Sequence, residues 1–254
     1  MLPLYTPDMP PVRDSLPLPP YLALAHAMVL DLQKSFATAR AHGMMKAINW
    51  TPTMPVLCRS QFGEDVYLWR LLGHKLSGVF VEVGAHDGTE LSVSYFFESI
   101  GWRGHLVEAS AELAGKARAL RPGSVVHGVA AWSDNETGVS LVGGNDLERR
   151  TVPGAAGIAV PAMTLDAVLA SEPAPIDFMS IDIEGSEAEA LRGMKSVRPR
   201  VLMIEDSEPA DKSPIIQIAG EMGYVYVAML WCNRVFVRAD ETELIARAVE
   251  MQRA

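Results

Sequence analysis

Seven short apolar runs, rich in β-branched residues, recur from Val79 onward and are separated mostly by stretches long enough for a helix. A strand buried on both faces has such a continuous apolar sequence, and a helical crossover makes two successive strands parallel. The pattern predicts an α/β fold with a seven-stranded, mostly parallel sheet covered on both faces by helices. The expected strands span residues 79–83, 105–109, 125–130, 178–182, 201–205, 224–228 and 234–238.

The last two expected strands are joined only by the residues MLWCN. This connection is too short for a helical crossover, so these strands should form an antiparallel hairpin at one edge of the sheet. Between about residues 140 and 160 the sequence is rich in glycine and has no clear period. We interpret that stretch as a loop beside the ligand site.

The N-terminal part of the chain has a different residue pattern. Residues 1–20 are rich in proline and suggest an extended arm, whereas residues 21–47 have apolar residues at helical spacing. Another helix is expected near residues 65–72. We therefore expect an arm and helix over residues 1–58 and a ligand-binding domain over residues 59–254.

Composition limits the classes of partner. The net charge is -9 and the pI is near 5.2, which disfavours nucleic acid as a substrate because phosphate binding needs clustered Lys and Arg. The two cysteines, Cys58 and Cys232, have neither a disulfide nor a zinc-site spacing, which is typical of a cytoplasmic protein. No signal peptide or membrane span is expected.

The sequence VFVEVGAHDGTELSVSYFFE predicts a strand, a glycine-rich turn and a helix that begins near Thr89. Gly84 and Gly88 would let the backbone approach a ligand at the open end of the sheet. The spacing is not the G-x-G-x-x-G of dinucleotide-binding proteins, which disfavours a nicotinamide oxidoreductase. A cationic cofactor without phosphate would instead be favoured by the acidic Glu82 and Asp87.

Two further strand ends carry candidate cofactor contacts. Glu108 ends the second strand and could accept hydrogen bonds from two ribose hydroxyls. After the third strand, Ala131 and Trp132 could border an adenine ring, although a plain core position is equally open for Trp132.

Carboxylates also follow the fourth and fifth strands. Asp182, Glu205 and Asp206 come at neighbouring strand ends, where like charges repel one another unless cations or protons intervene. Oxygen ligands of this kind suit Mg²⁺ or another hard divalent cation, which could polarise a substrate hydroxyl. For Glu184 and Glu187 we favour a simpler role as acidic residues at a helix N-terminus.

Histidine is the usual alternative base at neutral pH. His86 lies in the glycine-rich turn, where it could reach cofactor or substrate or could be a turn residue. We retain His86 and Asp182 as the candidate catalytic residues.

Together these motifs resemble the FkbM methyltransferase family over residues 60 to about 206. The matching segments are SQFGEDVYL, VFVEVGAHDGTELSVSYFFE, GWRGHLVEAS, MTLDAVL, IDFMSIDIEGSEAEALRGM and VLMIED. The resemblance implies a Rossmann-like class I methyltransferase fold and S-adenosylmethionine as the cofactor. It also implies O-methyl transfer to a hydroxyl of a sugar, a glycolipid or a secondary metabolite.

The resemblance also assigns roles to residues. It implies that Ser60 and Gln61 approach the methionine part of the cofactor, that Glu82 and Gly84 approach its amino-acid end, that Glu108 binds the ribose and that Asp182 lies at the catalytic centre. We expect the whole turn to contact the cofactor, namely Gly84, Ala85, His86, Asp87 and Gly88. Asp182, Glu205 and Asp206 are similar to the metal triad of magnesium-dependent sugar O-methyltransferases.

Two functions are compatible with these residues. The first is methyl transfer to a small-molecule or glycan acceptor. The alternative is a non-catalytic scaffold that retains the cofactor pocket and binds a partner. The N-terminal arm and helix could support a homodimer.

Overall fold

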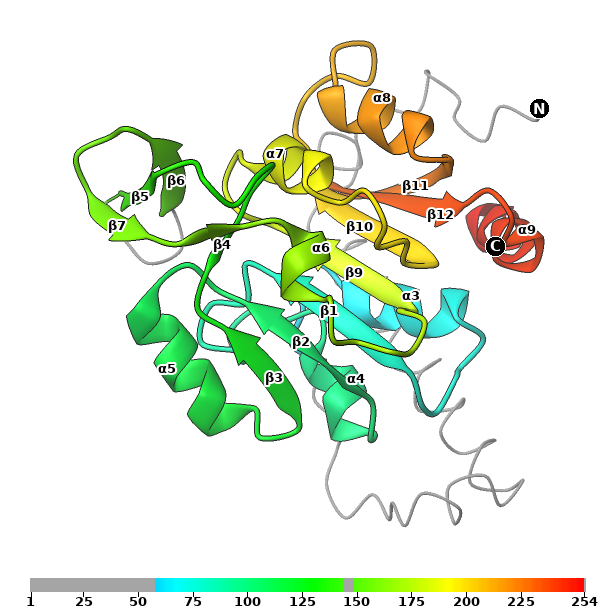
Figure 1. The fold of residues 1–254 in the computed structure, drawn as a ribbon. Coiled ribbons are helices and arrows are strands. Elements are labelled where there is room, and N and C mark those ends of the chain that lie inside the picture. The colour runs from blue at the N-terminus through cyan, green and yellow to red at the C-terminus, as the bar shows by residue number, and fades with distance from the viewer. Residues whose placement is uncertain (1–57, 144–148, 254) are drawn as a thin grey trace, which may run out of the picture.

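The computed structural model describes residues 58–143 and 149–253, and its centre is a seven-stranded sheet (Figure 1). The strand order is β11-β12-β10-β9-β1-β2-β3, and β12 is antiparallel to both of its neighbours while the other pairs are parallel. The strands are β1 (Val79–Val83), β2 (Arg103–Val107), β3 (Ser124–His127), β9 (Phe178–Ile181), β10 (Val201–Glu205), β11 (Tyr224–Leu230) and β12 (Asn233–Arg238). The predicted mostly parallel sheet and its hairpin at one edge are confirmed.

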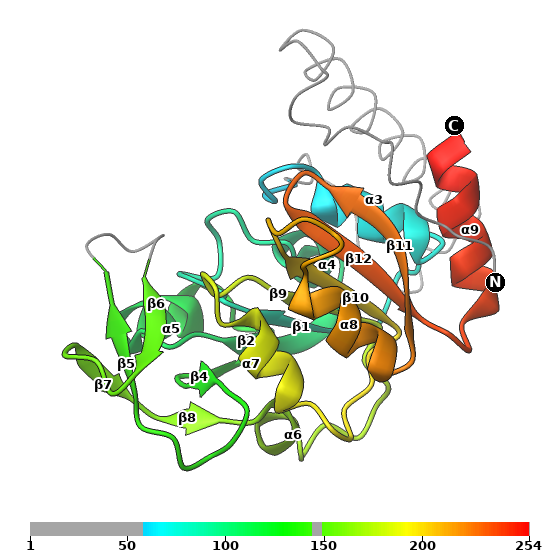
Figure 2. The ribbon, with the colours of Figure 1, turned by 90° about the horizontal axis from the view of Figure 1, so that it is seen from above.

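Seven helices are described in these residues, and most connect consecutive strands. They are α3 (Glu64–Leu71), α4 (Tyr95–Ser99), α5 (Ala111–Leu120), α6 (Leu165–Val168), α7 (Glu187–Arg192), α8 (Pro214–Glu221) and α9 (Thr242–Arg253). Figure 2 shows α3 and α9 on one side of the sheet and α6, α7 and α8 on the other. No described helix is both long enough and apolar enough to cross a membrane.

Each face of the sheet has its own hydrophobic core, because successive side chains of a strand point to opposite faces. Phe80 of β1 packs in the core that contains α3, α4 and α9, whereas Val79 and Val81 pack in the core that contains α6, α7 and α8. We call these the α3 face and the α7 face. Ser180 and Glu82, which alternate with residues of the α7-face core, lie on the α3 face.

Two local predictions are wrong. The helix expected near Thr89 begins only at Tyr95, because Ser92, Val93 and Ser94 hydrogen-bond to the Glu82 carboxylate. The expected loop at 140–160 contains three short antiparallel strands in its described part, β5 (Val139–Val142), β6 (Arg150–Pro153) and β7 (Ile158–Val160). These strands have only three or four residues each, too few to establish an alternation in the sequence.

The third expected strand, 125–130, is divided. β3 ends at His127, and the two-residue β4 (Ala130–Ala131) pairs with β8 (Ala162–Met163) outside the main sheet. Both views show the β5–β7 sheet at the opposite end of the molecule from α9 (Figures 1 and 2). The expected arm at 1–20, the helix at 21–47 and almost all of the unit at 1–58 lie outside the described residues.

Candidate functional site

A cavity of about 440 Å³ opens at the carboxyl ends of β1, β2, β9 and β10. β1 and β9 are neighbours in the sheet, and the chain leaves β1 toward β2 and β3 before it returns to β9. Ligands of open α/β sheets bind where the strand order reverses in this way. The cavity lies within the range of volumes usual for small-molecule and cofactor sites.

The glycine turn after β1 forms one wall of the cavity, but its glycines make room for protein rather than for ligand. A Cβ on Gly84 would lie 1.7 Å from the Asp182 carbonyl oxygen, and a Cβ on Gly88 would lie 2.8 Å from Cγ of Arg121. Both glycines have positive φ, at 87° and 80°. The two glycines do allow a close approach, as predicted, but the atoms that approach them belong to the end of β9 and to Arg121 and not to a ligand.

Glu82 lines the cavity at the end of β1, yet its carboxylate is occupied by the chain itself. Oε2 accepts hydrogen bonds from the hydroxyls of Ser92 at 2.7 Å and Ser94 at 2.5 Å, and Oε1 accepts one from the Val93 amide at 2.7 Å. Three donors thus surround a side chain that is 5% exposed. The Glu82 carboxylate therefore holds the segment 92–94 that follows the turn.

His86 lines the cavity and Asp87 does not, although His86 Nδ1 lies 3.8 Å from the Asp87 carboxylate. His86 lines the cavity, has a φ of 51°, and both of its ring nitrogens are buried without a hydrogen-bond partner. Asp87 accepts hydrogen bonds from the amides of Thr89 and Glu90, which lower the pKa of its carboxyl, and it is not among the residues that line the cavity. Gly88 does not line the cavity either.

Glu108 connects the turn to α5. Its Oε2 accepts from the His86 amide at 2.9 Å and its Oε1 accepts from the Ser110 amide at 2.7 Å. Each oxygen keeps a second lone pair for a ligand hydroxyl. Burial raises the pKa of this carboxyl, and the side chain lines the cavity.

The remaining candidate cofactor contacts divide into two groups. Gln61, Ala85 and Ala131 line the cavity. Ser60 and Trp132 do not: the Ser60 hydroxyl donates to Asp65 at 2.7 Å, and Trp132 packs in a small core with Val139 and Ala162. For Trp132 the structure therefore gives the plain core position.

Asp182 and Glu205 meet at the other end of the cavity. Asp182 is open to the cavity although protein surrounds it on most sides, and burial together with the charge of Glu205 raises the pKa of its carboxyl to about 8. Burial also raises the pKa of Glu205. The pair therefore holds a proton at neutral pH more readily than isolated carboxylates do.

The third member of this acidic group is Glu187, and the prediction of Asp206 at this place is wrong. One carboxylate oxygen each of Asp182, Glu187 and Glu205 lies within 4.8 Å of the others. Asp206 follows Glu205 and so faces the α7 side of the sheet, where Arg234 Nε donates to it at 2.7 Å. Glu187 is also bound by its own helix start, since its Oε1 accepts from the amides of Ile183 and Gly185.

Several residues of the cavity wall were not predicted. Phe62 and Trp231 stack with ring centroids 4.8 Å apart, and Trp231 has a φ of 58° at the tip of the β11–β12 hairpin. Ser180, two residues before Asp182, lines the cavity with its buried hydroxyl unpaired. The stack joins residues far apart in the sequence, so no local motif could have revealed it.

The strand order and the cavity define the class of the protein. The sheet has two helix-connected halves that meet at β1 and β9. The antiparallel strand β12 is inserted between β10 and β11. This is the Rossmann-like fold of class I methyltransferases. The model of the FkbM methyltransferase domain matches residues 82–226. The chain therefore belongs to the FkbM methyltransferase family.

Similar solved structures are more distant. A precorrin-6Y C5,15-methyltransferase from Geobacter metallireducens is 15% identical, with 68% of this chain and 77% of that chain covered and a TM-score of 0.41. The METTL16 methyltransferase domain is 14% identical, with 74% and 70% covered and a TM-score of 0.43. A TehB-like S-adenosylmethionine-dependent methyltransferase from Corynebacterium glutamicum is 10% identical, with 84% and 98% covered and a TM-score of 0.40. Among curated proteins, no sequence matches the chain significantly.

Proposed function

We propose that this methyltransferase transfers the methyl group of S-adenosylmethionine to a hydroxyl group of a sugar, a glycolipid or a secondary metabolite. The observation that carries the proposal is one cavity with Glu108 at the β2 end and the Asp182–Glu205 pair at the β9 and β10 end. The first end suits a ribose and the second suits a group that must lose a proton.

The β1–β3 side of the cavity fits the cofactor. Glu108 offers carboxylate oxygens to two hydroxyls, and Leu113, Val129 and Ala131 provide an apolar wall for an adenine ring. Gly84, Ala85 and His86 of the turn line the same space. The cofactor supplies a methyl group on a cationic sulfur, so the chain has only to align, desolvate and deprotonate the acceptor.

The β9–β12 side fits the acceptor. The stacked rings of Phe62 and Trp231 offer a flat apolar surface, and Asp182 and Glu205 beside them can accept hydrogen bonds from hydroxyls. A pKa of about 8 makes the Asp182 carboxylate a base matched to neutral or slightly alkaline pH. Asp182 would take the proton of the hydroxyl as the new bond to the methyl group forms.

The charge of the cavity favours a small-molecule or glycan acceptor over nucleic acid. Glu64, Glu90 and Glu184 line it in addition to the acids already described, and Arg149 is the one lysine or arginine among the described lining residues. Such a wall repels phosphate groups.

The acidic group also fits a divalent cation. Asp182, Glu187 and Glu205 provide three converging carboxylates, which are the donors that Mg²⁺ prefers. We propose that these three residues would hold the ion, which would lower the pKa of an acceptor hydroxyl.

Turnover of S-adenosylmethionine with a panel of hydroxylated acceptors tests the proposal against the scaffold alternative. We expect formation of S-adenosylhomocysteine that depends on one acceptor of the panel and disappears in Asp182→Asn. Cofactor binding without turnover of any acceptor would support the scaffold instead.

A further inference from the structure

Arg121 follows α5 and is a charged residue with only 1% of its surface exposed. Its guanidinium donates to the Gly88 carbonyl at 2.6 Å, to the Ser94 hydroxyl at 2.9 Å and to the Ser92 hydroxyl at 3.2 Å. Its Nε donates to Glu98 at 2.8 Å. A buried guanidinium destabilises a fold unless its donors are satisfied in this way.

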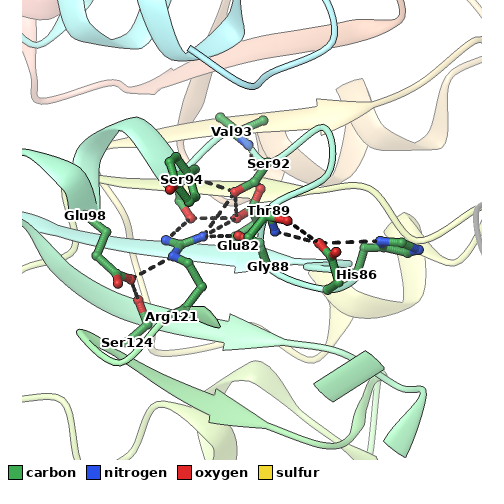
Figure 3. Close-up of polar contacts among 12 residues, drawn as sticks. Glu82, His86, Gly88, Thr89, Ser92, Val93, Ser94, Glu98, Arg121 and Ser124 are labelled. Atoms are coloured by element: carbon green, nitrogen blue, oxygen red, sulfur yellow. Dashed lines mark hydrogen bonds and ion pairs between the residues drawn. The ribbon is translucent and has the colours of Figure 1, made fainter. Parts of the chain in front are cut away.

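Glu82 completes the group from the opposite side. The hydroxyls of Ser92 and Ser94 each donate to Glu82 and accept from Arg121, so both serines lie between the two charges. The closest separation of the two charged groups is 4.0 Å. Figure 3 shows Arg121 between Glu98 on one side and Glu82 with the two serines on the other. We call this group the Glu82–Arg121 clamp.

The clamp holds the segment that forms the cofactor wall of the cavity. Between β1 and α4 the chain has no regular secondary structure, and His86, Gly88 and Leu91 have positive φ. Such backbone conformations persist only where surrounding contacts enforce them. His86, Leu91 and Val93 line the cavity, whereas Arg121 does not.

We propose that Arg121 is a positioning residue that, together with Glu82, fixes the segment 84–94 in the shape that binds the cofactor. The inference rests on the proposed function, since it assigns the cofactor to this wall. Arg121 acts without touching the ligand, by removing the conformational freedom that the segment would otherwise lose on binding.

Arg121→Lys tests the clamp, because lysine keeps the positive charge but cannot satisfy Gly88, Ser94 and Glu98 together. Arg234→Lys is the matched control: Arg234 is a buried arginine, 3% exposed, that binds Asp206 on the other face and does not line the cavity. Isothermal titration with S-adenosylhomocysteine should give a Kd raised about tenfold in Arg121→Lys and unchanged in Arg234→Lys. Both variants should have a lower Tm.

Hydrogen exchange distinguishes local loosening of residues 84–94 from a general loss of stability. Amides of residues 84–94 should exchange faster in Arg121→Lys than in Arg234→Lys when the two are compared at equal distance from their Tm. An unchanged Kd in Arg121→Lys, or an equal loss in both variants, would overturn the inference. If wild-type protein binds no S-adenosylhomocysteine, the proposed function fails, which is a different result.

A milder pair of variants covers the case in which Arg121→Lys does not fold. Ser94→Ala removes one contact to Arg121 and one to Glu82, whereas Ser99→Ala removes a hydroxyl that donates only to the Phe96 carbonyl of α4. Ser94→Ala should raise the Kd several-fold and Ser99→Ala should leave it unchanged. Equal affinities in this pair would contradict the clamp.

Discussion

Glu205 and Asp206 are adjacent in the sequence but serve opposite faces of the sheet. Glu205 ends β10 beside Asp182, while Asp206 is 6% exposed and pairs with Arg234 of β12 on the α7 face. Residue type and strand position predicted two of the three acids of this group, Asp182 and Glu205. The alternation of side chains along the strand excludes one of them, and Glu187 replaces it from the start of α7.

This difference predicts opposite effects of two equivalent substitutions. Asp182→Asn replaces a carboxyl whose ionisation is opposed by burial and by Glu205 with a neutral amide, so Tm should stay the same or rise while methyl transfer falls by about two orders of magnitude or more. Asp206→Asn weakens a buried ion pair and should lower the free energy of unfolding by roughly 3 kcal/mol. Thermal melts with turnover assays check both, and a large loss of Tm in Asp182→Asn would contradict our assignment.

Glu108 should govern the affinity for the cofactor. Its carboxylate is placed by the His86 and Ser110 amides, so Glu108→Gln should raise the Kd for S-adenosylhomocysteine by about tenfold through loss of charge-assisted hydrogen bonds. Glu112→Gln, on the exposed surface of α5 where Glu112 pairs with Lys116, is the matched control and should bind normally. Equal affinities of the two variants would remove Glu108 from the site.

At the scale of elements, the end of β1 depends on the end of β9. Gly84 has no side chain because the Asp182 carbonyl occupies the place of its Cβ. This contact brings the glycine turn and Asp182 together at one edge of the sheet. Gly84 lines the cavity, but the place of its missing Cβ is filled by protein and not, as predicted, by a ligand.

Gly84→Ala should therefore destabilise the fold more than strain in φ alone would. Gly185→Ala is the control, since Gly185 also has positive φ but nothing lies within 4 Å of its missing Cβ. The control should lose about 1 kcal/mol of unfolding free energy, and Gly84→Ala should lose clearly more. Equal losses in urea titrations would show that the Asp182 carbonyl can move aside.

The strands were predicted better than the segments between them. Apolar runs identify buried strands such as β1 and β10, whose predicted bounds agree with the structure. The delayed start of α4 was not predictable, because it depends on hydrogen bonds of Ser92 and Ser94 to Glu82 across a turn. For the same reason Arg121, remote in sequence from every motif, gave no signal.

At the scale of the whole molecule, the cavity collects negative charge on a fold that is already acidic. Asp182, Glu187 and Glu205 converge there, and among the described ion pairs none joins a basic residue to Asp182 or Glu205. A proton or a cation must lower this repulsion.

The expected cytoplasmic location, the homodimer and the division at residue 58 stay predictions.

The repulsion should appear in the pH dependence of stability. The pKa of Asp182 is raised from 3.8 to about 8, so between these values the folded protein holds a proton that the unfolded chain has released. The free energy of unfolding should fall as the pH rises toward 8, and this fall should be smaller in Asp182→Asn. Melts in EDTA between about pH 5 and about pH 8 check it, and equal slopes would contradict the shift.

Removal of divalent cations with EDTA tests whether turnover needs a bound cation. If Asp182, Glu187 and Glu205 hold Mg²⁺, dialysis against EDTA should abolish turnover and added Mg²⁺ should restore it. Full turnover by metal-stripped protein would refute the metal proposal and leave Asp182 as the base alone.

The central claim is that the cavity at the carboxyl ends of β1, β2, β9 and β10 binds S-adenosylmethionine. Isothermal titration of the folded protein with S-adenosylmethionine measures this directly. We predict saturable binding of one cofactor per chain, weakened in Glu108→Gln and retained in Asp182→Asn. No heat of binding from a protein that melts cooperatively would contradict the account.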